Sequence, residues 1–264
     1  MKIVFFGTPD FVTPVLDKLS QNFDVVQTIH SPQQLNNLSA EALAKEDGAI
    51  EQLRTLNPDF FVVASFGKIL TKELLEIPKL GAINIHPSLL PKYRGPTPIQ
   101  TAILNGDEKT GVSFIKMDEK VDHGPILLRF EEKILATDTF ESLAKRLFRL
   151  AADKLPEVIN VDLTETSQDE SKATYTKLLI RNDGYIDADK PPSAQQLNRM
   201  IRAYFPWPGV FTRYSLISPI SPKSLIKLLP NNQLQIEGKK PMSCKDFANG
   251  YPRGKEFLEK LNLV

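Results

Sequence analysis

The chain of 264 residues is long enough for two small domains or one large one. Charged residues make up 25% of it and hydrophobic residues 41%, a balance typical of a globular protein with an ordinary core. No apolar run approaches the roughly 20 residues of a membrane-spanning helix, and the N-terminus resembles a strand rather than a signal peptide. The single cysteine, Cys244, excludes an intramolecular disulfide and fits a reducing compartment. We therefore expect a cytoplasmic protein without a membrane partner.

The first half of the chain alternates between strand and helix patterns. Short apolar runs indicate buried strands at 2–6, 24–29, 59–64 and 81–85. Helical patterns begin at Thr8, where Pro9 suits a first turn, and cover roughly 40–56 and 71–76. Strands separated by helices predict an α/β domain with a doubly wound, Rossmann-like parallel sheet.

The next section predicts a strand pair followed by a long helix. The strand patterns at 111–117 and 125–131 lie close enough in sequence to form a hairpin-like unit. Asp138 and Glu141 have the spacing of a capping box at the start of the helix. Pro156 is expected to kink or split that helix, and the polar stretch 162–172 is expected to be a linker.

The last part of the chain differs in pattern and in charge. Ser193 is suited to cap a helix that ends before Pro206, and the remaining short strand patterns predict a small β-barrel domain. We place the domain boundary between 1–175 and 176–264. From Pro191 onward there are 11 Lys and Arg against 4 Asp and Glu, an excess of 7 positive charges. This excess favours contact with a large anion such as nucleic acid, although an unevenly charged solvated surface remains the alternative.

Two polar side chains interrupt the fourth predicted strand. Asn84 and His86 alternate with Ile83 and Ile85, so both polar groups point to the same side of the strand, and Pro87 ends it. In open α/β sheets this carboxyl end of the strands is where ligands bind. An imidazole beside an amide can accept a proton and polarise a carbonyl. Taken alone, a strand-end histidine is more often a hydrogen-bonded structural residue than a catalytic one, and an asparagine at this position also fits a turn.

Other chemistries lack their sequence signals. The histidines and Cys244 show no metal-ligand spacing, so we expect no metal site. The first strand is not followed by Gly-x-Gly-x-x-Gly, so a dinucleotide site is not expected. Cys244 lies far in sequence from the histidines, which disfavours a role as a nucleophile.

Four segments of the first half together carry a family resemblance. Residues 84–95 read Asn-Ile-His-Pro-Ser-Leu-Leu-Pro-Lys-Tyr-Arg-Gly, and residues 121–126 read Val-Asp-His-Gly-Pro-Ile. Both stretches resemble the signatures of the formyltransferases that use 10-formyltetrahydrofolate, as do Phe6–Asp10 and Ser65–Leu70. The resemblance implies the catalytic residues Asn84, His86 and Asp122, with 10-formyltetrahydrofolate as the formyl donor and no metal. It also implies donor- or substrate-binding roles for Phe66, Gly67, Ile69, Leu70, Ser88, Leu89, Leu90, Pro91, Arg94, Gly95, His123 and Gly124.

The second half bears on which amine is formylated. The segments Gly238–Ser243 and Asp246–Phe247 resemble the end of the family members that formylate methionyl-tRNA, which implies an OB-like barrel and initiator methionyl-tRNA as partner. Expected tRNA contacts are Arg199, Arg202, Lys239 and Lys240. No obligate protein partner is evident, and we expect a monomer.

Three alternatives remain. The catalytic core is shared with sugar-nucleotide N-formyltransferases, and the stretch 27–44, where tRNA-dependent members carry a basic loop, contains no Lys or Arg. Gly7–Asp10 lacks the glycine- and serine-rich phosphate loop of the glycinamide ribonucleotide enzymes, which disfavours that activity. A degenerate homologue that only binds folate or RNA is the non-enzyme alternative, which the presence of Asn84, His86 and Asp122 disfavours.

Overall fold

The computed structural model describes residues 1–8, 10–37, 47–160, 164–219 and 222–263. The strands are β1 (Lys2–Gly7), β2 (Asp24–Ile29), β3 (Phe60–Ala64), β4 (Ala82–His86), β5 (Lys109–Lys116), β6 (Ile126–Lys133), β7 (Val210–Tyr214), β8 (Ser224–Leu229), β9 (Gln233–Ile236) and β10 (Met242–Ser243). The helices are α1 (Thr13–Asn22), α2 (Pro32–Asn37), α3 (Asp47–Thr55), α4 (Lys72–Leu75), α5 (Pro98–Asn105), α6 (Phe140–Asn160), α7 (Ala194–Tyr204), α8 (Cys244–Gly250) and α9 (Gly254–Lys260), with 3₁₀ turns η1 (Asp10–Val12), η2 (Glu170–Lys172) and η3 (Arg181–Gly184).

The chain forms two compact units. One unit contains Met1–Pro98, Lys109–Lys133 and Ala144–Lys177, and the other contains Ile99–Glu108, Ile134–Leu143 and Leu178–Val264. Each therefore draws on more than one stretch of sequence. The boundary proposed at residue 175 stays a prediction.

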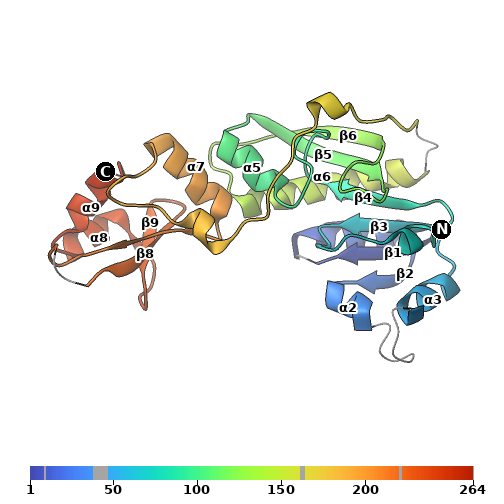
Figure 1. Cartoon of the computed structure of the whole chain (residues 1–264), viewed down its shortest axis with the longest axis horizontal. Coiled ribbons are helices and arrows are strands. Elements are labelled where there is room, and N and C mark those ends of the chain that lie inside the picture. Colours follow the sequence, from blue (N-terminus) through green and yellow to red (C-terminus); the bar gives the residue numbers. More distant parts are fainter. Residues whose placement is uncertain (9, 38–46, 161–163, 220–221, 264) are drawn as a thin grey trace. The chain divides into compact units, whose positions relative to one another are not determined.

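The first unit is built on a six-stranded sheet in the order β2-β1-β3-β4-β5-β6, which Figure 1 shows with β2 and β6 at its two edges. The pairs β1–β2, β1–β3 and β3–β4 are parallel, as the alternation of strands and helices predicts. The pairs β4–β5 and β5–β6 are antiparallel, which confirms the predicted strand pair and makes the sheet mixed. The α/β fold class is thus confirmed, with a parallel half and an antiparallel half that join at β4.

Aromatic packing fixes the loop that follows β3. Residues of β1 and β3 are buried on both faces, as expected for parallel strands covered on both sides. The ring of Phe6 on β1 packs edge-to-face against Phe61 on β3 at 5.0 Å and against Phe66 at 5.3 Å. Phe66 lies just beyond β3, so this packing attaches the 65–70 loop to the core.

Several helix boundaries differ from the sequence-based prediction. The first α-helix begins at Thr13, after a 3₁₀ turn, with a proline in its first turn. Pro9 and residues 40–46 of the second predicted helix lie outside the described residues. Helices α2 and α5 were not predicted, although each begins with a proline that suits a first turn.

The long helix α6 begins with a different cap from the predicted Asp138–Glu141 pair. The backbone N–H of Ser142 donates to Oγ1 of Thr139 at 3.3 Å, and the N–H of Thr139 donates to Oγ of Ser142 at 3.0 Å. This reciprocal pair is a capping box shifted by one residue. Asp138 instead accepts the N–H of Leu135 at 2.7 Å, because its side chain closes the preceding turn. The helix continues past Pro156, so of the predicted kink or split the split is wrong and the kink stays a prediction.

The second unit contains an antiparallel sheet in the order β10-β9-β8-β7. The small β-rich module is confirmed, and its described strands number one fewer than the five of a complete OB barrel. Helix α7 is capped as predicted, since Oγ of Ser193 accepts the N–H of Gln196. Helices α8 and α9 stand where only strands were predicted, and Ser243 with Asp246 forms the cap of α8. None of the described helices is both long and apolar enough to cross a membrane.

Candidate active site

A cavity of about 440 Å³ lies in the first unit where β3 and β4 end. Its walls come from the 65–70 loop, the end of β4, the 95–98 loop and the 117–122 loop that follows β5. The apolar part of the wall consists of Val63, Phe66, Ile69, Leu70, Ile85, Pro87, Pro96, Pro98, Ile115, Met117 and Val121. Asn84, His86 and Asp122 are the polar residues at the β4 end of the wall. The position agrees with the rule that ligands of α/β sheets bind at the carboxyl ends of the strands.

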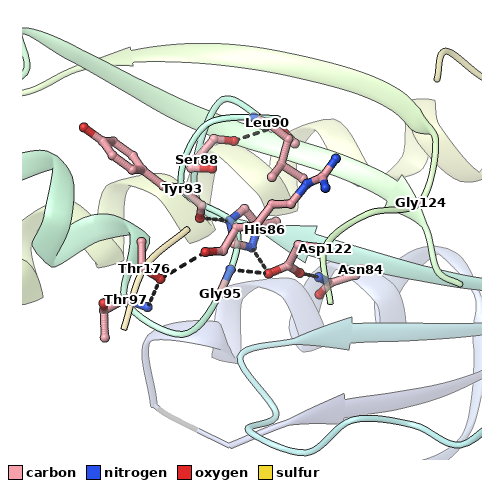
Figure 2. A network of polar contacts seen from close by, with 12 residues as sticks. Asn84, His86, Ser88, Leu90, Tyr93, Gly95, Thr97, Asp122, Gly124 and Thr176 are labelled. Atoms are coloured by element: carbon pink, nitrogen blue, oxygen red, sulfur yellow. Dashed lines mark hydrogen bonds and ion pairs between the residues drawn. The ribbon is translucent and has the colours of Figure 1, made fainter. Parts of the chain in front are cut away.

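Asp122 brings the three predicted catalytic side chains together, as Figure 2 shows. Its Oδ1 accepts the amide N–H of Asn84 at 2.9 Å. Its Oδ2 accepts the backbone N–H of Gly95 at 2.8 Å and lies 3.4 Å from Nδ1 of His86. Only 11% of the Asp122 side chain and 5% of the His86 side chain are exposed, so these contacts act in a largely dry environment.

The charge of Asp122 follows from these contacts. Burial raises the pKa of Asp122, but the charge and hydrogen bond of His86 and the N–H of Gly95 outweigh it and leave the pKa below the ordinary value of 3.8. Asp122 is therefore an ionised carboxylate at neutral pH.

The ring of His86 is oriented by a backbone carbonyl. Its Nε2 lies 2.9 Å from the carbonyl oxygen of Tyr93, which can only accept, so Nε2 carries a hydrogen. Nδ1 is then the nitrogen directed to Asp122. Through the Tyr93 carbonyl, the 87–97 loop thus determines which ring nitrogen of His86 points toward Asp122.

Three residues around the site have a left-handed backbone conformation. Asp122 has a φ of 50°, Ser65 a φ of 49° and Tyr93 a φ of 65°. Non-glycine residues rarely occupy this left-handed region, and such positions concentrate where the surrounding contacts enforce them. The loop after Asp122 also depends on Gly124, since a Cβ there would lie 1.8 Å from the carbonyl oxygen of Lys116.

The predicted donor-binding residues fall into two groups. Phe66, Gly67, Ile69, Leu70 and Gly95 line the cavity. Ser88, Leu89, Leu90, Pro91, Arg94, His123 and Gly124 are not among its lining residues. Within that second group, the hydroxyl of Ser88 donates to the carbonyl of Lys92 at 2.6 Å, and Nδ1 of His123 lies 2.5 Å from Oδ2 of Asp118.

Arg94 is buried away from the cavity wall. Its side chain is 1% exposed, and the guanidinium contacts Gln168, Glu170 and Tyr175. The carboxylate of Glu170 raises the pKa of Arg94, so the group is a permanent cation. Three residues at or beside the site belong to no recognisable sequence pattern and were not predicted: Gln168, Met117 and Asp118.

Most of the cations predicted to contact tRNA are held by neighbours in the second unit. Arg199 donates to the carbonyl of Asn105 at 3.3 Å, and Arg202 donates to that of Asp138 at 2.8 Å. Lys239 donates to the hydroxyl of Tyr251 at 2.9 Å. Lys240 is exposed.

Comparison with known proteins agrees with this geometry. Residues 24–159 match the family described as formyl transferase. The methionyl-tRNA formyltransferase of Caldicellulosiruptor saccharolyticus is 35% identical, over 95% of this chain and 97% of that protein. That of Roseiflexus sp. (strain RS-1) is 38% identical over 81% of this chain and 73% of that protein.

Solved structures show the same fold. The methionyl-tRNA formyltransferase from Clostridium thermocellum superimposes with a TM-score of 0.70 at 19% identity, over 92% of this chain and 99% of that one. A sugar N-formyltransferase from Shewanella gives a TM-score of 0.64 at 20% identity, over 88% and 98%. On the sequence comparisons, this chain belongs to the formyltransferase family and, within it, to the methionyl-tRNA formyltransferases.

Proposed function

We propose that this chain transfers the formyl group of 10-formyltetrahydrofolate to the α-amino group of initiator methionyl-tRNA. The observation that carries the proposal is the Asn84–Asp122–His86 cluster on the wall of the cavity. A reaction that prepares tRNA for translation takes place in the cytoplasm, which is where we place this protein.

The size and lining of the cavity support binding of a folate donor. Its volume of about 440 Å³ lies within the range of small-molecule sites. Phe66, Ile69, Leu70 and Val121 offer apolar surfaces for a flat heterocycle, and the polar cluster lies at the β4 end. The donor, when bound, supplies a formyl carbon that an amine can attack. Among the described residues no group of three potential ligands could hold a metal ion.

The residues of the cluster divide the chemistry between them. The attacking amine must be neutral, and negative charge develops on the formyl oxygen as the bond forms. The amide nitrogen of Asn84 has two hydrogens, one bonded to Asp122, and we assign the other to that oxygen. We assign to the Nδ1 of His86, which faces Asp122, one of two roles according to its protonation state. With Nδ1 protonated the ring donates to the formyl oxygen, and with Nδ1 unprotonated it accepts the amine proton. Asp122 orients the ring, stabilises its positive charge and helps relay a proton to the leaving nitrogen.

The β-rich module is the proposed contact for the tRNA. Its excess of 7 positive charges from Pro191 onward suits a phosphate backbone and predicts salt-dependent binding. Lys240 is exposed and is therefore the first of the four proposed cations to test. Lys240→Ala should lower the slope of binding against salt concentration, and an unchanged slope would remove this residue from the proposal.

A formyl-transfer assay tests the function. The donor is 10-formyltetrahydrofolate, and the acceptors are methionyl-tRNA with an initiator acceptor stem and with an elongator-type stem. Transfer to the initiator form, absent with His86→Ala, supports the proposal. Normal donor binding without transfer to either tRNA would contradict it.

A sugar-nucleotide amine is the second candidate acceptor. The observation that favours it is the absence of Lys and Arg from residues 27–44. An amino-sugar nucleotide supplied in place of the tRNA discriminates between the two: formylation of the sugar with no transfer to methionyl-tRNA would replace the first proposal with the second.

A further inference from the structure

The side chain of Gln168 joins the Asp122 loop to the buried Arg94. Its amide nitrogen donates to two backbone carbonyls, those of Asp122 and Gly124, both at 2.8 Å. Its Oε1 accepts from Nε of Arg94 at 3.1 Å and from Nη2 at 2.9 Å. The orientation of the amide is unambiguous, because carbonyl oxygens only accept and a guanidinium only donates.

Arg94 is in turn fixed by contacts that use all of its donors. Nη1 donates to Oε2 of Glu170 at 3.0 Å and to the hydroxyl of Tyr175 at 3.2 Å, and Nη2 donates to Oε1 of Glu170 at 2.6 Å. With the two bonds to Gln168, the five N–H groups of the guanidinium are all satisfied. The buried cation is therefore held in place and can anchor Gln168.

The segment around Gln168 is hydrogen-bonded to the rest of the chain at two places beside the site. Thr166 pairs with Ile126 through two backbone hydrogen bonds of 2.9 and 2.8 Å. The backbone N–H of Arg94 donates to the carbonyl of Thr174, and the backbone N–H of Thr176 donates to the carbonyl of Arg94, both at 2.8 Å. The segment 164–177 is thus joined by backbone hydrogen bonds to the loops that carry Gly95 and Asp122. Its first half was predicted to be a linker.

These contacts hold the backbone that carries the Asp122 carboxylate. Asp122 has a left-handed backbone conformation, which persists only when its surroundings enforce it. Gln168 donates to the carbonyl of this residue and to the carbonyl two residues later, so a rotation of the turn between them would break at least one of these bonds. We propose that Gln168, anchored by Arg94, is a positioning residue that acts on the reaction by holding Asp122 against His86. This inference rests on the proposed function.

Two substitutions of Gln168 distinguish its contact with Arg94 from its contacts with the Asp122 loop. Gln168→Ala removes both donated bonds and the acceptor for Arg94, whereas Gln168→Glu keeps an acceptor for Arg94 and removes only the donors. We expect kcat to fall by about tenfold to 100-fold in both variants, since a small displacement of a catalytic group has an effect of this size. We expect KM for the donor to stay within about threefold of the wild-type value, because Gln168 does not line the cavity.

A matched control lies in the same segment. Lys172 is exposed and forms an ion pair with Asp169, three residues earlier, at 3.1 Å. Lys172→Ala should leave kcat and KM unchanged. Thermal unfolding of all variants, followed by circular dichroism, establishes that each is folded at the assay temperature.

A ¹⁵N NMR measurement reports on the environment of the His86 ring and does not require turnover. The chain contains three histidines, so ¹⁵N labelling of histidine gives a spectrum in which each ring can be assigned by substitution. The Nδ1 signal of His86 should move in both Gln168 variants and stay in place in Lys172→Ala, while the signals of His30 stay in place in every variant. This result would support the positioning role even if the wild-type protein formylated none of the acceptors tested, an outcome that counts against the proposed function alone.

Three results would overturn the inference. The first is a kcat within threefold of wild type in both Gln168 variants. The second is a loss confined to KM for the donor, which would make Gln168 part of the binding site. The third is an unchanged His86 signal in the folded Gln168→Glu variant, since the residue would then not act through the Asp122–His86 pair.

Discussion

Oδ2 of Asp122 lies 3.4 Å from Nδ1 of His86, and the same oxygen accepts the backbone N–H of Gly95 at 2.8 Å. The carboxylate is thereby shared between the imidazole and the loop that follows the Asn84–His86 strand. One side chain from a distant part of the sequence thus fixes both the ring and the loop beside it. Loss of its charge should disturb the reaction and the acid stability of the protein together.

Asp122→Asn tests the effect on the reaction. The substitution preserves the shape of the side chain but removes the charge that faces His86. We expect kcat to fall by at least about 100-fold, because both the orientation and the charge stabilisation of the imidazole are weakened. Single-turnover kinetics measure the effect, and equilibrium binding of the donor is the control. A loss below tenfold, with donor binding intact, would contradict the role assigned to Asp122.

The same variant tests the pH dependence of stability. The pKa of Asp122 lies below its ordinary value of 3.8, so its ionised form stabilises the folded state. That contribution is complete above the unfolded pKa, near pH 4, and is lost as the pH falls through the lower folded pKa. Denaturant unfolding should therefore show wild type to be more stable than Asp122→Asn at pH 7, with a difference that narrows below about pH 4. A difference independent of pH would mean that the carboxylate charge does not stabilise the fold.

Asn84 and Asp122 should behave as a unit. Asn84→Ala removes the donor assigned to the formyl oxygen, a change that costs about 10² to 10³ in rate at comparable sites. The Nδ2–Oδ1 contact of 2.9 Å couples the two side chains. Rates of Asn84→Ala, Asp122→Ala and the double variant form a cycle, in which we expect the double loss to be smaller than the product of the single losses. Multiplicative losses would show that the two side chains act independently.

Periodicity in the sequence located the strand residues of the site. The alternation of Asn84 and His86 with apolar residues places both on one side of β4, and Pro87 ends the strand at the edge of the sheet. Asp122 has no such pattern, since it lies in a loop with a left-handed backbone. It was recognised only through resemblance to a family signature.

The supporting contacts could not be predicted from local sequence. Gln168 lies in a polar, exposed stretch that has the composition of a linker, and its hydrogen bonds to Asp122 and Gly124 depend on long-range folding. Arg94 stands in a motif next to catalytic residues, which suggested ligand binding. Its burial against Glu170 becomes visible only when the segment 164–177 is in place. Local patterns predict elements, whereas contacts between loops depend on the whole fold.

Gly124→Ala tests the close packing of the Asp122 loop. An added Cβ would lie 1.8 Å from the carbonyl oxygen of Lys116, and the backbone cannot yield freely because Lys116 donates to the carbonyl of Pro125 at 3.0 Å. We expect the free energy of unfolding to fall by about 3 kcal/mol. Gly250→Ala is the matched control, since its added Cβ has no atom of the described residues within 4 Å apart from its chain neighbours and its own helix backbone. Ala in helix α8 should be neutral or stabilising by up to about 1 kcal/mol. Equal effects of the two substitutions in urea unfolding would show that the close approach at Gly124 is relieved without cost.

The β-rich module contains a tyrosine whose titration reports on its packing. The hydroxyl of Tyr214 donates to Oε1 of Glu256 at 2.7 Å and lies 2.7 Å from Nη2 of Arg253. Burial and then the hydrogen bond to Glu256 raise the pKa of Tyr214 to about 12 from its ordinary 10.0. A raised pKa means that the unfolded chain loses this proton first, so the stabilisation by neutral Tyr214 should decline as the pH rises from about 10 to about 12. Ultraviolet titration of the six tyrosines should show one late component that disappears in Tyr214→Phe. If the late component survives that substitution, the Tyr214–Glu256 contact does not hold the proton in solution.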